Sequence, residues 1–341
     1  MHIHELRQRL QDAGAGPLHE HRILRMWSHA RPQDSGRRRP HTFFPSSLLA
    51  AMPRIEAELA GLARIDAVHP GADGSERLLV ALADGQTVES VLLPRGGLCV
   101  SSQVGCAVGC QFCMTGRDGL LRQVGSAEIV AQVVLARQRR AVTKVVFMGM
   151  GEPAHNLDNV MEAIELLGTV GNIGHKNLVF STVGDPRAFE RLQHSTVKPA
   201  LALSLHTTDA ALRRKLLPRA PNLSPEELVD ASERYARACG YPVQYQWTLL
   251  EGVNDSDEEV EGIVALLGGK YGVLNMIPFN TVDGVAFSRP QRARCEQIAR
   301  TLRQRGILTK LRYSAGQDVD GGCGQLRARA IESRVVLHRG T

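Results

Sequence analysis

The spacing of apolar residues predicts alternating strands and helices from about residue 90 onward. Short apolar runs of strand length recur at 98–103, 144–148, 177–183, 200–205, 243–249, 274–278 and 308–313. Between most of them lie helical patterns that open near Ser126, Leu157, Ser224 and Ser288. Ser224-Pro-Glu-Glu227 can form a capping box at the start of one helix. This alternation indicates a parallel sheet with right-handed crossovers, and six or so repeats favour an incomplete α/β barrel over a closed eight-fold one.

The chain before this point follows a different pattern. Residues 3–13 and 23–30 have helical spacing, and so do residues 45–62, where Pro53 predicts a short turn before it and the main helix after it. Strands 77–82 and 87–93 flank Asp84-Gly85, a hairpin signal. We therefore expect a small, mainly helical accessory domain over residues 1–84 and an α/β domain over residues 85–341.

Composition narrows the class of protein. The 341 residues are 43% hydrophobic, yet no apolar run reaches about 18 residues, so no membrane span is expected. The N-terminus lacks the apolar core of a signal peptide, and seven cysteines, three of them clustered, do not look like a secreted disulfide framework. These features predict a reduced, cytoplasmic protein. The net charge of +6, together with the basic stretch at 36–40, makes contact with RNA one reading and a solvated loop the other.

The main chemical signal is a cluster of three cysteines. Cys106, Cys110 and Cys113 have the spacing C-x-x-x-C-x-x-C in a stretch that contains glycine. Thiolates at such short spacing bind soft metals and iron–sulfur clusters. Three ligands without a fourth favour a 4Fe–4S cluster with one open iron, which S-adenosylmethionine (SAM) can chelate. A structural zinc site is the alternative, but zinc prefers a second cysteine pair, and none follows nearby.

Polar residues and glycines gather where the predicted strands end. They are Gly151 and Glu152 after the second strand, Ser181 on the third, Ser204-Leu205-His206 at the fourth and Asn280 after the sixth. Each is commonly a cap or turn residue. Because barrel enzymes place their chemistry at the carboxyl ends of strands, the joint occurrence predicts a ligand-binding rim.

Two further cysteines stand apart from the cluster. Cys99 lies on the first strand of the repeat, and Cys323 lies in Gly321-Gly-Cys-Gly, whose glycines suggest a loop that can carry the thiol to a reacting centre. An inert buried cysteine is the ordinary alternative for each.

Taken together, these motifs resemble the radical-SAM RNA methyltransferases of the RlmN/Cfr family. The resemblance runs from about Glu89 to about Leu326 and rests on the segments 99–113, 148–153, 204–206 and 318–326. It implies a partial (β/α)6 radical-SAM barrel with a 4Fe–4S cluster on the three clustered cysteines. It also implies that the rim described above binds SAM, that Cys323 is the methyl carrier, that Cys99 is its resolving partner and that Glu89 is the general base.

The implied reaction gives a role to each of these residues. Carbons 2 and 8 of adenine are poor nucleophiles, so a Cys323 thiolate would take a methyl group from one SAM. A second SAM would give a 5′-deoxyadenosyl radical that activates the S-methyl group for addition to the adenine. Glu89 would then remove the ring proton, and Cys99 would release the product by forming a disulfide.

The leading hypothesis is therefore methylation of a ring carbon of adenosine in rRNA or tRNA. The implied partners are the RNA substrate and a reductant such as flavodoxin or ferredoxin. Two alternatives remain open at this stage, a radical-SAM methylase of a non-RNA substrate and an iron–sulfur RNA-binding protein without turnover. Binding alone would need neither Cys99, Cys323 nor Glu89.

Overall fold

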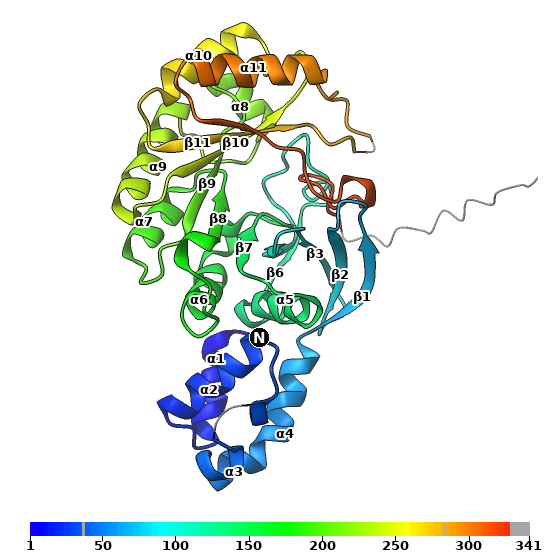
Figure 1. Cartoon of the computed structure of the whole chain (residues 1–341), viewed down its shortest axis with the longest axis vertical. Coiled ribbons are helices and arrows are strands. Elements are labelled where there is room, and N and C mark those ends of the chain that lie inside the picture. Colours follow the sequence, from blue (N-terminus) through cyan, green and yellow to red (C-terminus); the bar gives the residue numbers. More distant parts are fainter. Residues whose placement is uncertain (36–37, 283, 328–341) are drawn as a thin grey trace, which may run out of the picture.

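The computed structural model describes residues 1–35, 38–282 and 284–327 (Figure 1). Gly36 and Arg37, which begin the predicted RNA-binding basic stretch, lie outside the described residues, as do residues 328–341 of the predicted catalytic domain.

The first 61 residues form an N-terminal helical unit, at the lower end of Figure 1. Leu6, Leu10, Ile23, Leu24 and Leu48 are fully buried in it, at intervals that place the apolar side of each helix toward its neighbours. Its helices are α1 (Ile3–Asp12), α2 (Pro17–Ser28), α3 (Pro40–Phe43) and α4 (Ser46–Gly61), with a short 3₁₀ turn η1 (Gln33–Ser35). The second helix thus begins six residues before the predicted start at residue 23.

The predicted break at Pro53 is wrong, because α4 runs through the proline without interruption. Pro53 is exposed, whereas Leu48, Met52, Ile55 and Leu59 are buried on both sides of it. The proline removes one backbone hydrogen bond on the solvent side, while packing of the apolar face on a single core holds both halves of the helix in line.

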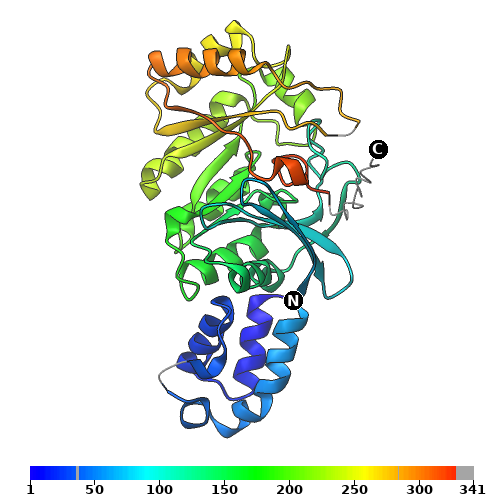
Figure 2. The same ribbon diagram turned by 45° about the vertical axis from the view of Figure 1, so that its right-hand side comes forward.

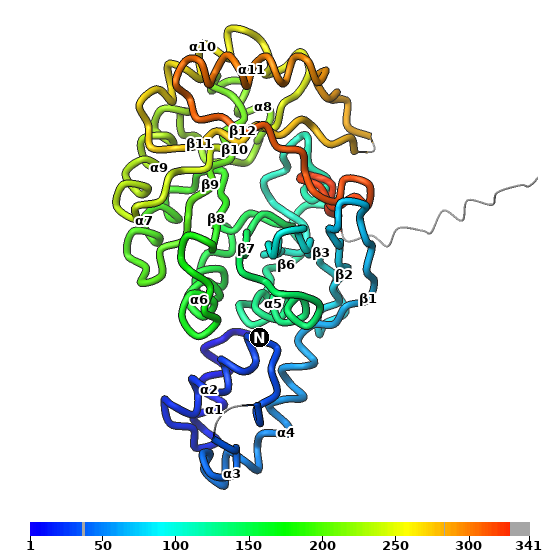
Figure 3. Tube along the Cα trace, viewed as in Figure 1, coloured from blue at the N-terminus to red at the C-terminus, as the bar shows by residue number. Residues whose placement is uncertain are grey.

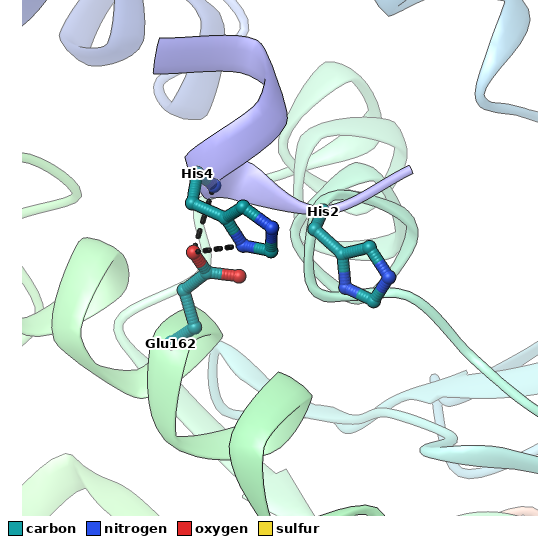
Figure 4. A group of neighbouring side chains, drawn as sticks. All are labelled: His2, His4 and Glu162. Atoms are coloured by element: carbon teal, nitrogen blue, oxygen red, sulfur yellow. Dashed lines mark hydrogen bonds and ion pairs between the residues drawn. The ribbon is translucent and has the colours of Figure 1, made fainter. Parts of the chain in front are cut away.

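Glu162 joins the start of α1 to the rest of the molecule (Figure 4). Its carboxylate accepts the backbone N–H groups of Ile3 at 3.2 Å and His4 at 2.7 Å, which would otherwise lack partners at the helix N-terminus. The Nδ1 atom of His2 lies 2.6 Å from Oδ1 of Asn159, and that of His4 lies 3.2 Å from Glu162. His2, His4 and Glu162 are residue types that bind metals, but these hydrogen bonds already account for the group as a helix anchor.

Within the described residues, one ten-stranded sheet in the order β1-β2-β3-β4-β7-β8-β9-β10-β11-β12 forms the rest of the framework. Strands β1 to β4 are antiparallel, with β2 and β3 forming the predicted hairpin, and β4 onward are parallel. The bounds are β1 (Ala63–Pro70), β2 (Glu76–Leu82), β3 (Thr87–Leu92), β4 (Gly97–Cys99), β7 (Lys144–Phe147), β8 (Leu178–Thr182), β9 (Ala200–Ser204), β10 (Val243–Leu249), β11 (Gly272–Pro278) and β12 (Thr309–Leu311). The sheet continues across residue 84, and a domain division at that residue stays a prediction.

Helices cover the outside of the curved parallel part, as Figures 1 and 3 show. Six crossovers connect its seven strands, so the predicted open α/β barrel is confirmed. The helices are α5 (Ser126–Arg139), α6 (Leu157–Gly168), α7 (Pro186–His194), α8 (Ala210–Leu216), α9 (Pro225–Cys239), α10 (Asp257–Leu267) and α11 (Arg292–Gln304), with 3₁₀ turns η2 (Pro153–Asn156), η3 (His175–Asn177) and η4 (Gln317–Val319). The capping box predicted at Ser224 is present: Ser224 Oγ accepts from Glu227 N–H at 3.2 Å, and Glu227 accepts from Ser224 N–H at 2.8 Å.

The strand predicted at 98–103 is split in two. After β4 the chain turns at Ser101, whose N–H donates to Gln132 at 2.9 Å and whose hydroxyl donates to the Glu89 carbonyl at 2.5 Å. At Ser101, hydrogen bonds that involve side chains thus take the place of the backbone hydrogen bonds of a continuous strand. The next strand, β5 (Gln103–Gly105), pairs with β6 (Leu120–Gln123) in a second small sheet. Among the described residues, we find no helix with the length and apolar character that crossing a membrane requires.

Candidate active site

The three clustered cysteines lie in the loop between β5 and β6. Cys106 is buried, and Cys110 and Cys113 are half-buried. Backbone hydrogen bonds hold the loop in place, from Cys106 N–H to Gly119 at 2.9 Å and from Cys113 N–H to Cys110 at 3.1 Å. A third, from Gln111 N–H to the Leu216 carbonyl at 3.0 Å, ties the loop to α8.

The chemistry of these thiols fits a bound cluster. Burial raises the pKa of Cys106 to about 12, and the charges of Glu152 and Cys113 add to the effect. Burial and the two neighbouring cysteines also raise the pKa of Cys110 well above its usual value. Burial therefore disfavours the thiolate form of these cysteines, and iron bound to them would supply the compensating positive charge. The loop therefore offers three soft ligands of the kind a 4Fe–4S cluster uses.

The predicted rim residues do lie at the carboxyl ends of neighbouring parallel strands. Gly151 and Glu152 follow β7, Ser181 is near the end of β8, Ser204 to His206 lie at the end of β9, and Asn280 follows β11. Gly151 has φ of 104°, and a Cβ there would lie 2.6 Å from the Gln103 side chain, so only glycine fits this turn.

Glu152 is almost fully buried at this rim. Its side chain accepts backbone N–H groups from Ala154 and Val183, each at 3.2 Å. Burial raises its pKa to about 7, although the hydrogen bond from Thr182 and those backbone donors oppose the rise. A buried carboxylate of this kind is suited to receive an ammonium group, whose charge would keep it ionised.

His206 links the rim to the cysteine loop. Its φ is 67°, an uncommon conformation for a residue other than glycine. Its Nδ1 accepts the Thr248 N–H at 3.0 Å, so the proton of the neutral ring is on Nε2, and burial lowers its pKa to about 3. The ring packs edge-on against Phe112, between the second and third cysteines, with the centroids 4.8 Å apart. The adjacent Leu205 is fully buried.

The structure brings Cys323 to the cysteine loop. Cys323 is exposed on the segment that follows η4, and the Gly324 carbonyl accepts the Met114 N–H at 2.8 Å. The ribbon of the chain around η4 is red in Figure 2. Asn280 Nδ2 donates to the Cys323 carbonyl at 2.9 Å, so this predicted SAM ligand also holds the Cys323 segment. Burial raises the pKa of Cys99 to about 12, and the nearby charge of Cys323 contributes. Cys99 and Cys323 are 224 positions apart in the sequence. In the fold they are nevertheless close enough for the charge of Cys323 to affect the pKa of Cys99.

Glu89, the predicted base, is fully buried on β3. It forms an ion pair with the equally buried Arg77, and its Oε2 accepts the Arg327 N–H at 2.8 Å. Both carboxylate oxygens therefore have donors, and Glu89 anchors the chain just beyond Cys323. Each oxygen keeps a second lone pair, so these donors do not by themselves exclude the predicted role as a base.

Comparisons with known proteins agree with this geometry. The model of the radical SAM superfamily matches residues 100–265. A probable RNA methyltransferase of Aromatoleum aromaticum is 71% identical over 333 residues, 98% of this chain and 94% of that protein. Another, of Pseudomonas aeruginosa, is 66% identical over 97% of this chain and 96% of its own length. The crystal structure of a radical SAM methyltransferase from Sphaerobacter thermophilus has a TM-score of 0.82 and 34% identity, covering 96% of this chain and 98% of that one.

The chain belongs to the radical-SAM RNA methyltransferases. As such an enzyme it uses a 4Fe–4S cluster and SAM, and the fold and cofactors predicted from its motifs are confirmed. The roles of the individual site residues stay predictions, supported by the contacts described above.

Sequence reasoning missed Arg213 of this radical-SAM enzyme. It lies in Leu212-Arg-Arg-Lys215, which looks like an exposed basic run. Arg213 is nevertheless buried, with 3% of its surface exposed, whereas Arg214 is exposed. The available signal was its spacing of three residues from the buried Leu216, which puts both on one face of α8.

Proposed function

We propose that this enzyme methylates carbon 2 or carbon 8 of an adenosine in rRNA or tRNA, through an S-methyl intermediate on Cys323. The observation that carries the proposal is the position of Cys323, exposed and yet held beside the cysteine loop with Cys99 nearby. A methyltransferase that moved the methyl group directly from SAM to its substrate would need neither thiol. A carrier thiol that reaches solvent can meet a polymer substrate, and a second thiol can release it.

A pocket beside the cysteine loop has the character expected of an RNA entrance. It has a volume of about 660 Å³, and its lining includes Cys110, Cys113, Arg117, Arg219 and Phe287. Both arginines are exposed at its rim, where guanidinium groups can pair with phosphates, and Phe287 offers a surface for a base. These contacts support RNA as the substrate class named by the 71% and 66% identical relatives.

The chain's own residues have distinct jobs in this proposal. The Cys323 thiolate attacks the methyl carbon of the SAM sulfonium, and S-adenosylhomocysteine leaves. The S-methyl group on Cys323 is later joined to the adenine carbon. The cluster, when bound, supplies the electron for reductive cleavage of a second SAM. The adduct would give one electron back to the oxidised cluster and its ring proton to Glu89. Cys99 then attacks the Cys323 sulfur, the bond from sulfur to the methylene carbon breaks, and that carbon takes up a proton to become the methyl group of the product. A reductant then reopens the Cys99–Cys323 disulfide, and a flavodoxin or ferredoxin reduces the cluster.

The experiment that tests this function compares total RNA from cells with and without the gene. Nucleosides from digested RNA are separated and weighed by mass spectrometry. We expect 2-methyladenosine or 8-methyladenosine to be missing from cells that lack the gene. It should return when the wild-type gene is supplied again, but not when the Cys323→Ala gene is supplied. Identical methyladenosine profiles with and without the gene would exclude RNA as the substrate in those cells.

The buried Glu152 predicts a pH dependence for SAM binding. Its pKa of about 7 means that the carboxyl group is neutral in more acidic solution and ionised in more basic solution. If it receives the SAM ammonium, affinity should rise about tenfold between about pH 6 and about pH 8, because binding requires the ionised form. Anaerobic calorimetry of the cluster-loaded protein measures this. Glu152→Gln should bind SAM weakly without that trend, and the same pH trend in the variant would contradict the assignment.

A further inference from the structure

Arg213 is a buried cation without an acidic partner among the described residues. Its Nη2 donates to the backbone carbonyls of Val183 at 2.6 Å and Ser204 at 3.1 Å, which lie at the ends of β8 and β9. Its Nε is buried and has no hydrogen-bond partner, and no ion pair of the described residues includes it. Burying a guanidinium in this way destabilises the fold unless a negative charge compensates it.

The helix that carries Arg213 is bonded to the cysteine loop on either side of Cys110. The Leu216 carbonyl at the end of α8 accepts the Gln111 N–H at 3.0 Å, and the Arg219 N–H donates to the Val108 carbonyl at 3.3 Å. These two contacts, one from the end of α8 and one from the segment just after it, hold the helix against residues 108–111, which include the second predicted cluster ligand. The position of Arg213 relative to that ligand is therefore set by backbone hydrogen bonds.

Electrostatics point to the same neighbour. Burial lowers the pKa of Arg213 to about 10, while the charges of Cys110 and Glu152 oppose the change, so the group remains a cation at neutral pH. Glu152 receives its hydrogen bonds from Ala154 and Val183 instead. The Cys110 thiolate, once iron binds it, would join Glu152 as a negative charge acting on Arg213.

We propose that Arg213 supplies the buried positive charge that stabilises the reduced state of the cluster and so raises its reduction potential. The inference rests on the proposed cluster at the three cysteines of the 106–113 loop. Iron–sulfur potentials respond to nearby net charge and to solvent exposure, and a cation in a dry site favours the added electron. Arg213 would then be a residue that sets how readily a physiological reductant can start the reaction.

The test is a redox titration of the cluster-loaded protein without SAM, with dithionite as the reductant and electron paramagnetic resonance as the readout. Arg213→Met and Arg213→Gln remove the charge, and Gln keeps hydrogen-bond donors. Arg213→Lys keeps the charge but loses the fork that binds the two carbonyls. Arg214→Met removes an exposed charge from the same helix and serves as the matched control.

We expect the neutral variants to be about tenfold harder to reduce, which is a shift of about 59 mV to more negative potential for one electron. Arg213→Lys and Arg214→Met should stay close to the wild type. A wild-type potential in Arg213→Met or Arg213→Gln would overturn the inference, including the case in which only SAM affinity changes. A potential in Arg213→Lys as low as in the neutral variants, or failure of Arg213→Lys to load a cluster, would assign the residue to holding the strand ends instead.

The outcomes also distinguish a failure of this inference from a failure of the proposed cluster site on which it depends. If the wild-type protein loads no cluster, the proposed cysteine site is wrong. If the wild type loads one and the potentials do not follow the charge at residue 213, only the role of Arg213 is wrong. Should the neutral variants fail to load, Arg213 is assigned to holding the cluster site together, and the inference on the potential is overturned.

Discussion

Cys99→Ala protein purified from cells should carry RNA joined covalently to Cys323. The substitution leaves the carrier thiol, the cysteine loop and the rim in place but removes the thiol that displaces the product. Methyl transfer to Cys323 and addition to the adenine can then proceed, and the adduct persists. A denaturing gel run with and without ribonuclease should show the RNA-dependent species, and peptide mass analysis should place the attachment at Cys323.

Two further substitutions, Cys323→Ala and Cys239→Ala, should give results that differ from that of Cys99→Ala. Cys323→Ala should give neither methylated protein nor RNA product, because the methyl acceptor is gone. Cys239→Ala changes a cysteine at the end of α9, outside the proposed site, and should behave as the wild type. Normal turnover by Cys99→Ala without any linked RNA would show that the enzyme does not use the covalent route.

Cys106→Ala is expected to abolish cluster loading. The loop offers three thiol ligands and, with one removed, an iron loses its anchor. Anaerobic reconstitution followed by iron and sulfide analysis should give about four irons per chain for the wild type and far fewer for the variant. SAM cleavage with dithionite should be lost in parallel.

The control for this experiment is Cys295→Ala, which alters a buried cysteine of α11. It should load a full cluster, since Cys295 lies outside the cysteine loop. If Cys106→Ala also loads fully and cleaves SAM, the cluster is not held by this cysteine.

The barrel and its rim were predictable from sequence because strand ends follow from local pattern. Each apolar run gives a strand, and Glu152, Ser204 and Asn280 come at or just after one. The helix break predicted at Pro53 was wrong because helix propensity takes no account of the core on which both halves of α4 pack. The split strand after Cys99 depends on Ser101, whose partners are 12 and 31 residues away in sequence, and such contacts leave no local pattern.

Only part of the candidate site could be predicted from the sequence. Spacing predicted the three clustered cysteines as ligands, and the family resemblance suggested roles for Glu89 and Cys323. Neither could show that Arg77 and the Arg327 backbone occupy the Glu89 carboxylate, or that Asn280 donates to the Cys323 carbonyl. Those contacts bridge up to 238 positions, and they exist only because the folded sheet brings its edge and the C-terminal segment together.

The segment around Cys323 is held by single, separable hydrogen bonds. They run from Asn280 to the Cys323 carbonyl, from Met114 to Gly324, from Thr115 to Leu326 and from Arg327 to Glu89. Each contributes about 1 kcal/mol net, and glycines flank the thiol. We therefore expect this segment to open locally while the sheet beneath it stays folded, which amide hydrogen exchange would measure. If Cys323 carries the methyl group as proposed, the lifetime of that open state would set how long the methylated thiol has to find its nucleotide before the segment closes again.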